Sequence, residues 1–251
     1  MKDSHTNGVD VPVITVDGPG GSGKGTITTR LANYLGWHFL DSGALYRLTA
    51  LAVMKTRVPL ADADALGEIA ANLEIRFETK GNEVVSWLEG EDVSGRLRQE
   101  DTGVMASKVA AIPAVRTALT QRQRRFRQPP GLVADGRDMG TVIFPDAKLK
   151  IFLTASAEIR AERRYKQLKE KGESVNLTPL FEEIKARDLR DQSRSVAPLR
   201  PAEDAVIIDS TDLSIDEVFD RKWPVQVDSQ YTNFLALFDQ IVDSADDCFC
   251  A

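Results

Sequence analysis

A short apolar run that breaks into glycines and ends in a lysine constrains the fold of this chain more than any other stretch. Residues 13–26 read Val-Ile-Thr-Val-Asp-Gly-Pro-Gly-Gly-Ser-Gly-Lys-Gly-Thr. The β-branched residues Val13, Ile14 and Val16 are typical of a strand buried on both faces of a parallel sheet. After Gly23, apolar residues at positions 27, 31 and 35 favour a helix. We therefore expect a strand, a tight loop and a helix in succession.

The loop between this strand and this helix has the features of a phosphate-binding site. Gly18, Gly20, Gly21 and Gly23 would let backbone N–H groups converge on phosphate oxygens and would permit positive φ angles. Lys24 adds a positive charge, and the N-terminal dipole of the helix favours an anion at the same place. An ordinary glycine-rich turn is the alternative, but the order of strand, glycines, lysine and helix is that of a nucleotide-binding P-loop.

The spacing Gly-x-x-x-x-Gly-Lys fits the P-loop pattern with one departure. Gly25 stands where serine or threonine is usual, and Thr26 follows it, so the hydroxyl comes one residue late. The Lys-Gly-Thr ending resembles nucleoside monophosphate kinases, in which the threonine reaches toward magnesium through water. The resemblance implies the same role for Thr26.

Length and composition limit the architecture and the classes of partner. A chain of 251 residues with 42% hydrophobic content can fill the core of one α/β domain that carries an insertion, and two full domains are not expected. The net charge of -6 argues against a protein that coats nucleic acid or binds anionic membranes. Residues 1–10 are polar and no stretch of about 18 apolar residues occurs, so we expect a disordered N-terminal tail and a cytoplasmic protein without export.

Metal-binding side chains are scarce. The two cysteines are Cys248 and Cys250, and the two histidines are His5 and His38. One intervening residue is a poor spacing for a relaxed disulfide, and these side chains are too few for a structural zinc site.

Four further apolar runs predict the remaining strands of a parallel sheet. They lie at residues 37–40, 132–134, 149–154 and 205–208, and helical patterns follow them. This alternation is typical of the doubly wound α/β architecture. We therefore predict a P-loop kinase fold, with a five-stranded parallel sheet flanked by helices in a single domain of residues 11–224.

Residues 60–98 interrupt this rhythm. Short alternating stretches at 73–77 and 84–88 surround a Lys-Gly-Asn turn at 80–82, which is the signature of a β-hairpin. We predict a small antiparallel lobe inserted into the domain, and such insertions often carry specificity.

Two helices are expected between residues 102 and 127, with Pro113 in the first turn of the second. The second helix ends in a basic run. We interpret this run as a solvated helix face rather than a binding patch. Its members are Arg122, Arg124, Arg125 and Arg127.

Polar side chains gather where two of the predicted strands end. Ser42 follows one strand and is well placed to cap the next helix, with Tyr46 and Arg47 in its first turns. Asp135 follows another strand, at the position of a Walker B carboxylate that can hold magnesium or its waters. Taken alone, a packed tyrosine, a surface arginine and an Asp-Gly turn would explain these residues. Beside a P-loop, Asp135 favours the metal.

Residues 157–194 are rich in arginine and read as two helices around a break near Gly172. Arg187, Asp191 and Arg194 are spaced i, i+4 and i+7, so one helical face would present them in a column. An intrahelical salt bridge explains the column equally well, but two arginine-bearing helices around a hinge also suit a lid that closes over phosphates. The other arginines here are Arg160, Arg163, Arg164 and Arg190.

These residues together resemble bacterial cytidylate kinases, with the resemblance running from about Val11 to Asp220. The P-loop alone indicates only nucleotide binding, whereas two other stretches are far more specific to that family. These are Asp-Ser-Gly-Ala-Leu-Tyr-Arg at 41–47 and Asp-Gly-Arg-Asp-Met-Gly at 135–140. Gly-Glu-Asp-Val-Ser at 90–94 and Arg-Asp-Leu-Arg-Asp-Gln-Ser-Arg at 187–194 also match.

The resemblance implies transfer of the γ-phosphoryl group of ATP to CMP and dCMP, with Mg²⁺ as cofactor, giving CDP or dCDP and ADP. It implies that residues 60–98 bind the nucleoside monophosphate and that residues 157–194 form the lid. The implied partners are these small nucleotides, without nucleic acid or membrane, and a monomer is expected.

The resemblance also implies roles for the residues at matching positions. Catalysis would fall to Lys24, Asp135, Arg137 and Arg187, and the metal to Thr26 and Asp135 through water. ATP would contact Gly18, Gly20, Gly21, Ser22, Gly23, Lys24, Gly25, Thr26 and Arg163. The acceptor nucleotide would contact Ser42, Tyr46, Arg47, Ser107, Arg116, Arg137, Asp138, Arg187, Asp191 and Arg194.

Within this set, the resemblance assigns particular side chains to the base and the sugar. Asp138 would accept from the amino group of cytosine, with Arg116 and Ser107 as donors, and Asp191 would take the ribose hydroxyls. A carboxylate that faces the carbonyl of uracil would repel it, which predicts discrimination against UMP.

Two alternative functions stay open. Another small P-loop kinase, acting on AMP or shikimate, would share the loop and differ in the acceptor. A GTP-hydrolysing switch has less support, because no Asn-Lys-x-Asp stretch for guanine recognition occurs in the chain. Residues 225–251 depart from the family pattern and are expected either to form a short docked helix or to be disordered.

Overall fold

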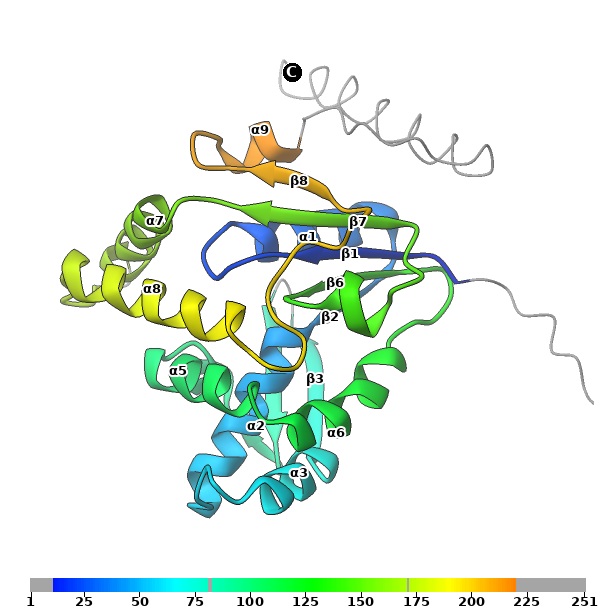
Figure 1. Cartoon of the computed structure of the whole chain (residues 1–251), viewed down its shortest axis with the longest axis vertical. Helices are drawn as coiled ribbons and strands as arrows, with labels where there is room; N and C mark the ends of the chain where they lie inside the picture. Colours follow the sequence, from blue (N-terminus) through cyan, green and yellow to red (C-terminus); the bar gives the residue numbers. More distant parts are fainter. Residues whose placement is uncertain (1–10, 81–82, 171, 220–251) are drawn as a thin grey trace, which may run out of the picture.

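The computed structural model describes residues 11–80, 83–170 and 172–219 of the chain. Our predictions for the two ends, residues 1–10 and 225–251, lie outside the described residues, as do His5, Cys248 and Cys250. Within the described ranges the chain forms a large sheet flanked by helices and a smaller sheet among helices of its own (Figure 1).

The large sheet is fully parallel, with strand order β2-β6-β1-β7-β8. At its centre lies β1 (Val13–Asp17), and all five of its residues are buried, which confirms the strand predicted from the β-branched run. Because this strand is covered on both faces, it needs no alternation of polar and apolar residues. The other strands are β2 (His38–Asp41), β6 (Leu132–Gly136), β7 (Leu149–Thr154) and β8 (Val206–Asp209).

The hairpin predicted within residues 60–98 is confirmed. β3 (Ile75–Lys80) and β4 (Glu83–Leu88) pair antiparallel, and β5 (Glu91–Asp92) adds a third strand. This sheet shares an apolar core with several helices, so the hairpin is stabilised by packing against those helices. We call the whole unit the small lobe; its helices are α2 (Ser42–Thr56), α3 (Ala63–Ala71), α4 (Ser94–Leu97), α5 (Glu100–Val109) and α6 (Pro113–Arg124).

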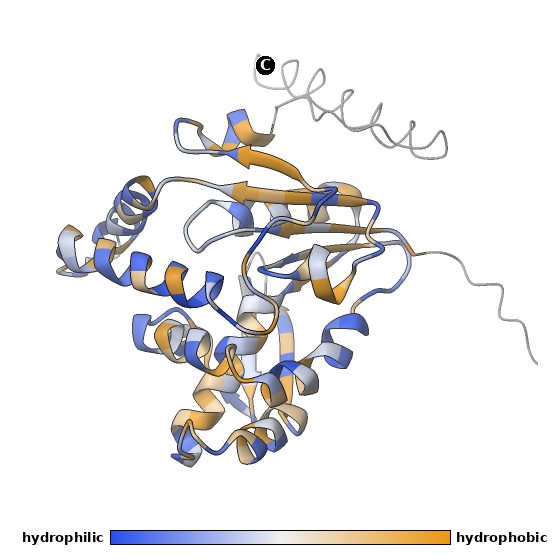
Figure 2. Cartoon of the chain, viewed as in Figure 1, coloured by the Kyte–Doolittle hydropathy of each residue, from blue (hydrophilic) through white to orange (hydrophobic). Residues whose placement is uncertain are grey.

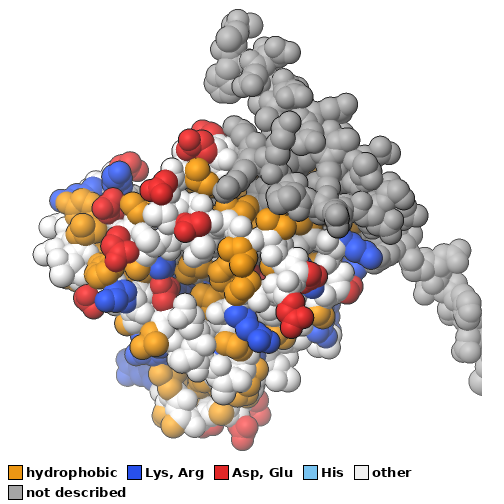
Figure 3. All heavy atoms as spheres, turned by 45° about the horizontal axis from the view of Figure 1, so that its top comes forward, with side chains coloured by type: hydrophobic (Ala, Val, Ile, Leu, Met, Phe, Trp, Pro, Cys, Tyr) orange, Lys and Arg blue, Asp and Glu red, His pale blue; other side chains and the backbone are white. Residues whose placement is uncertain are grey.

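The remaining helices accompany the large sheet. They are α1 (Lys24–Leu35), the π-helical turn η1 (Met139–Ile143), α7 (Ala157–Glu170), α8 (Leu177–Gln192) and α9 (Ile215–Phe219). Figure 2 shows the strands of the large sheet as mostly hydrophobic and α8 as mostly hydrophilic. None of the helices in the described ranges is long and apolar enough to cross a membrane. On the face in Figure 3, acidic and basic side chains are interspersed.

The helix cap predicted at Ser42 is wrong. Asp41 is the N-cap residue of α2, and its Oδ1 accepts a hydrogen bond of 2.9 Å from the N–H of Ala44. A carboxylate there gains both the cap hydrogen bond and the attraction of the helix dipole. Ser42 is instead the first helical residue and is buried.

The basic run at the end of α6 is not simply the solvated face that the sequence predicts. Arg122 donates to the carbonyl of Leu73 at 2.8 Å, inside the small lobe. Arg124 donates to the carbonyl of Ile143 at 3.0 Å, and Arg127 donates to that of Val11 at 2.7 Å. These arginines therefore tie α6 to both parts of the fold.

The glycines of the P-loop differ in their backbone conformation. Gly18, Gly21 and Gly23 have φ angles of 150°, 81° and 93°, as the loop pattern predicts, but Gly20 does not have a positive φ. A Cβ atom on Gly18 would lie only 2.0 Å from the carbonyl oxygen of Leu153 in β7. Gly18 is therefore required where the chain leaves β1 against its neighbouring strand.

Asp17, the last residue of β1, fixes a segment of the site from within the core. Its carboxylate is buried and accepts hydrogen bonds of 2.8 Å from the N–H groups of both Met139 and Gly140, the first residues of η1. Arg137 and Asp138 come directly before this turn, so Asp17 sets where they lie. Burial raises the pKa of Asp17 to about 7, although both backbone hydrogen bonds lower it. No local sequence pattern marks Asp17 for this role.

Replacing Gly18 tests the close approach to β7. Gly18→Ala should lower the free energy of unfolding by at least about 2 kcal/mol, because the methyl group meets backbone and alanine disfavours this φ. Urea unfolding measures the change. Gly95→Ala is the matched control, since a Cβ at Gly95 meets no atom within 4 Å. Equal stability of Gly18→Ala and wild type would contradict the described packing.

The raised pKa of Asp17 predicts how stability depends on pH. Between the ordinary value of 3.8 and about 7, the folded state holds a proton that the unfolded state has lost. The contribution of Asp17 to the unfolding free energy should therefore fall as pH rises through this range, by up to about 1.4 kcal/mol per pH unit, and then level off. Urea titrations of wild type and Asp17→Asn at several pH values give the difference. A difference that does not change with pH would show that the pKa is not raised.

Candidate active site

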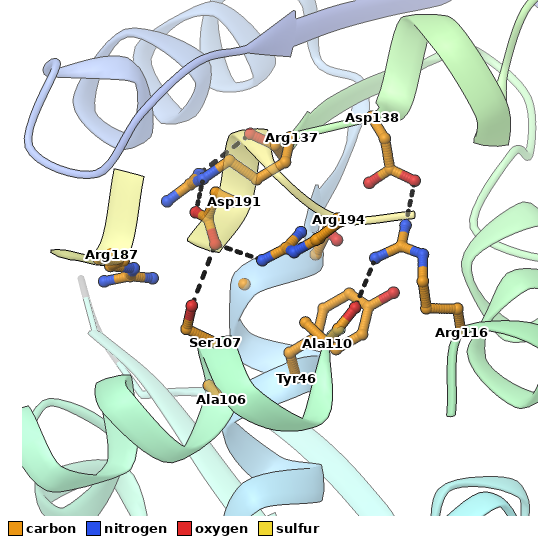
Figure 4. Close-up of a pocket in the computed structure, with 13 residues that line it drawn as sticks. Tyr46, Ala106, Ser107, Ala110, Arg116, Arg137, Asp138, Arg187, Asp191 and Arg194 are labelled. Atoms are coloured by element: carbon orange, nitrogen blue, oxygen red, sulfur yellow. Dashed lines mark hydrogen bonds and ion pairs between the residues drawn. The ribbon is translucent and has the colours of Figure 1, made fainter. Parts of the chain in front are cut away.

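The residues predicted to bind the acceptor nucleotide, all but Arg47, meet between the large sheet, the small lobe and α8. An open pocket with about 420 Å³ of empty space lies there. Figure 4 shows side chains from segments far apart in the sequence gathered around it. The carboxyl edge of a parallel sheet is where open α/β folds bind ligands. The pocket is lined by Ser42, Gly43, Tyr46, Ala106, Ser107, Ala110, Arg116, Gly136, Arg137, Asp138, Arg187, Asp191 and Arg194.

Lys24, the first residue of α1, is buried at the base of the P-loop. Its Nζ donates to the carbonyl of Pro19 at 3.0 Å and lies 3.9 Å from Oδ1 of Asp135. Burial and the charge of Arg137 lower the pKa of Lys24 to about 8, while Asp135 raises it. Burial likewise raises the pKa of Asp135 to about 6, against the charge of Lys24. An anion placed beside Lys24 would favour its charged form.

Two guanidinium groups approach the same loop from other segments. A Cβ atom on Gly20 would lie 3.5 Å from Nη2 of Arg137 and 3.6 Å from Nη1 of Arg187. Arg187 makes no hydrogen bond or ion pair with any residue that the structure describes, and its Nε is buried without a partner. Burial and the charge of Arg137 lower the pKa of Arg187 to about 10. The site therefore holds a cation whose charge no carboxylate pairs directly.

Asp191 lies between Arg137, Arg194 and Ser107 and joins the three segments that carry them (Figure 4). Its Oδ1 accepts a hydrogen bond of 3.0 Å from Ser107 Oγ and another from Arg194, while its Oδ2 accepts from Nε of Arg137 at 3.2 Å. Burial raises its pKa, but the charges of Arg137, Arg194 and Arg187 outweigh that effect and hold the pKa below its ordinary value. Asp191 therefore stays ionised and fixes the arginines around it.

The column predicted along one face of α8 is wrong at one position. α8 ends at Gln192, so Arg194 lies beyond the helix and pairs with Asp191 from the following segment. The N–H of Leu199 in that segment also donates to the carbonyl of Asp191 at 2.8 Å. The i+7 spacing assumed a longer helix than the chain forms.

An ion pair closes the other end of the pocket. Arg116 of α6 donates to Asp138 and, at 3.1 Å, to the carbonyl of Ala110; the two paired side chains are only 6% and 2% exposed. The guanidinium carbon of Arg116 lies 5.6 Å from the ring centroid of Tyr46. Burial raises the pKa of Tyr46 to about 12, so the ring stays neutral. This corner offers a carboxylate acceptor and a guanidinium donor beside an aromatic ring.

Besides the P-loop residues and Asp135, two predicted site residues do not line the pocket. Arg47 donates to the carbonyl of Leu97 at 2.6 Å, within the small lobe. Arg163 donates to the carbonyls of Ser210 at 2.5 Å and Leu213 at 3.1 Å, beyond β8. These acceptors are 47 to 50 residues away in the chain, so sequence spacing could not reveal them.

Asp135, one of the two residues predicted to hold magnesium, faces Gly25, the residue before the other, Thr26. Oδ2 of Asp135 is 3.5 Å from where a Cβ of Gly25 would be, so the carboxylate faces the start of α1. A hard cation prefers such an oxygen and would offset the burial that raises its pKa. Within the described ranges, no three His, Cys, Asp or Glu side chains gather into a metal site. The residues therefore fit a metal that phosphates and waters help to hold.

Two residues without a predicted role also contact the P-loop. Arg160 donates to the carbonyl of Gly20 at 3.1 Å, and Oγ of Ser210 donates to that of Ser22 at 3.1 Å. Arginine-rich composition pointed to the region of Arg160, but no local pattern marked Ser210.

Known proteins resemble this chain over most of its length. A family model described as cytidylate kinase matches residues 14–225. The cytidylate kinase of Stutzerimonas stutzeri is 62% identical over 213 residues, which cover 84% of this chain and 93% of that protein. Those of Photobacterium profundum (61% identity; 82% of this chain and 91% of that protein) and Pseudomonas fluorescens (60%; 85% and 94%) are similar. The resemblance inferred from the sequence motifs is confirmed: this chain belongs to the cytidylate kinase family.

Proposed function

We propose that this protein transfers the γ-phosphoryl group of ATP to CMP and dCMP, giving CDP or dCDP and ADP. Membership of the cytidylate kinase family supports the reaction. The convergence of Lys24, Arg137 and Arg187 on the P-loop supports this loop as the place where the phosphoryl group is transferred. Phosphoryl transfer requires such a place, because positioning and neutralisation of the spread negative charge supply most of the catalysis.

The P-loop and the start of α1 are the proposed site for the phosphates of ATP. Backbone N–H groups between Gly20 and Lys24 would donate to phosphate oxygens, and the dipole of α1 would favour these anions. Lys24 would exchange the carbonyl of Pro19 for a phosphate oxygen. Mg²⁺, when bound, would neutralise charge on the phosphates, and Asp135 and Thr26 would hold its waters.

The corner formed by Arg116 and Asp138 is the proposed site for the base. Asp138 would accept a hydrogen bond from the amino group of cytosine, while Arg116 and Ser107 would donate to its ring nitrogen and carbonyl. The pair of Arg116 and Asp138 is already formed and buried, so little reorganisation is needed. Ser42 and Tyr46 would complete the wall on the side of α2.

The acceptor's sugar and phosphate would lie between the base corner and the P-loop. Asp191 would take the ribose hydroxyls, with Arg194 holding it in place. Arg137 and Arg187 would hold the acceptor phosphate and then the migrating group, because guanidinium groups grip phosphate oxygens in pairs. An acceptor phosphate oxygen would then attack the γ-phosphorus, while the bond to the bridging oxygen of ADP breaks.

Two proposed contacts require movement. Arg47 would leave the carbonyl of Leu97 to reach the acceptor phosphate, and Arg163 would leave that of Ser210 to reach ATP. Closure of the small lobe and of α7 and α8 over the nucleotides would allow both and would exclude water. The monomeric state and the cytoplasmic location remain predictions from the sequence.

Steady-state assays with ATP and magnesium, against CMP, dCMP, UMP, AMP and shikimate, test the proposed function. We expect the highest kcat/KM for CMP and dCMP, and a value for UMP at least about tenfold lower. Preferred turnover of AMP or shikimate would support a different P-loop kinase. GTP hydrolysis without phosphorylation of any acceptor would support a switch. Either result would contradict the proposal.

Lys24→Ala should reduce kcat by at least about 100-fold while the protein stays folded, because a charge aimed at the transferring group is lost. The initial rate of ADP formation with CMP measures this, and circular dichroism monitors the fold. Lys166→Ala, which removes an exposed lysine from α7, is the matched control and should leave kcat unchanged. Near-normal turnover of Lys24→Ala would remove Lys24 from the mechanism.

Asp138→Asn should narrow the preference for CMP over UMP by about tenfold or more, because an amide can donate to the carbonyl of uracil where a carboxylate repels it. The ratio of kcat/KM values for the two nucleotides measures this preference. Asp146→Asn, at an exposed aspartate beyond η1, serves as control. Unchanged selectivity in Asp138→Asn would place base recognition elsewhere.

A further inference from the structure

Arg160 of α7 is buried, with 4% of its surface exposed, yet it does not line the pocket. Its Nε donates to the carbonyl of Ala155 at 2.9 Å, and its Nη1 donates to that of Gly20 at 3.1 Å. The same guanidinium forms a two-pronged ion pair with Asp188 of α8, at 3.1 Å and 2.5 Å. One side chain thus connects the P-loop, α7 and α8.

The charge of Arg160 is already paired, in contrast to that of Arg187. A guanidinium held by both oxygens of a carboxylate has little left to offer a phosphate. The side chain of Asp188 is 17% exposed, but that of Arg160 is only 4% exposed. Breaking the pair would leave the buried charge of Arg160 uncompensated, which is costly, so the pair is expected to persist through the reaction. Arg160 is therefore suited to position other groups rather than to bind a ligand.

The ion pair joins segments whose relative position matters for the proposed phosphoryl transfer. Asp188 is the neighbour of Arg187 in α8, and Gly20 is the loop residue that Arg187 approaches. Arg160 holds Gly20 through its carbonyl group. The side of Gly20 where another residue would carry a Cβ atom faces Arg137 and Arg187. The position of α8 is thus linked to that of Gly20 through the ion pair.

We propose that Arg160 and Asp188 are positioning residues that couple the donor site at the P-loop to the acceptor-binding arginine on α8. This inference rests on the proposed roles of the P-loop and Arg187 in the transfer. The pair sets the distance between Gly20 and Arg187, so binding of donor phosphates at the loop favours the arrangement of α8 that grips the acceptor phosphate. The two nucleotides then bind with positive cooperativity.

The variant Asp188→Asn tests this coupling. CMP affinity is measured by calorimetry alone and with a saturating non-hydrolysable ATP analogue and magnesium. Wild type should bind CMP several-fold more tightly when the analogue is present, which is the usual size of such coupling. The coupling ratio is the affinity for CMP with the analogue divided by the affinity without it. In Asp188→Asn this ratio should fall close to one, while the affinity for CMP alone changes less than about threefold. The kcat should drop by at least about tenfold, since small misplacements of reacting groups cost that much.

Companion variants separate positioning from simple stabilisation. Asp188→Glu keeps the carboxylate and should recover part of the coupling and of kcat. The double variant of Arg160→Lys with Asp188→Asn should lose less coupling and kcat than the two single variants lose in sum. Such non-additivity is expected of partners in one pair. Asp204→Asn, which breaks the ion pair with Lys150 away from the pocket, is the control and should leave the coupling ratio unchanged.

The outcomes are distinct. Loss of stability and activity in Asp188→Asn with an unchanged coupling ratio would overturn the proposal and leave the pair a structural support. A wild type that binds the two nucleotides independently would overturn it as well. Failure of wild type to phosphorylate CMP in the presence of ATP would instead overturn the proposed function. The steady-state assay measures this separately from the binding experiment.

Discussion

The site depends on the cost of bringing positive charges together out of water. Arg137 lowers the pKa of both Lys24 and Arg187, in addition to the effect of burial. Carboxylates offset part of this cost: Asp135 lies 3.9 Å from Lys24, and Asp191 lies 3.2 Å from Arg137. What remains is an excess of positive charge beside a loop of free backbone N–H groups. In this account, that excess is compensated when the phosphates of two nucleotides arrive.

The fold delivers these charges from parts of the chain that are distant in sequence. The tips of β1 and β6 lie side by side in the parallel sheet, which brings the P-loop next to Asp135 and Arg137. Helix α8 reaches the same place from the other side, and the small lobe supplies the base corner through α6. Buried acceptors hold each piece: Asp17 fixes the turn after Asp138, and Asp191 fixes the arginines. The groups proposed to touch substrate are thus positioned by groups that do not.

Local sequence patterns predicted the elements of this fold well. The P-loop, the five parallel strands and the hairpin each have a signature within a few residues, and nine of the thirteen residues that line the pocket lie within the family motifs. Contacts between distant segments could not be predicted in this way. Arg160 meets a carbonyl 140 residues away, and Arg47 and Arg163 satisfy carbonyls that no spacing rule connects to them. The cap at Asp41 rather than Ser42 has a different, local reason, since two adjacent residues could both fill the role.

The most direct measurement is a crystal structure with a bisubstrate analogue in which adenosine and cytidine are joined by a chain of five phosphates. The account predicts that the phosphates run from Lys24 past Gly20 to the guanidinium groups of Arg137 and Arg187, with the cytosine amino group against Asp138. A phosphate chain that avoids Arg187, or a cytosine bound away from Asp138, would contradict it.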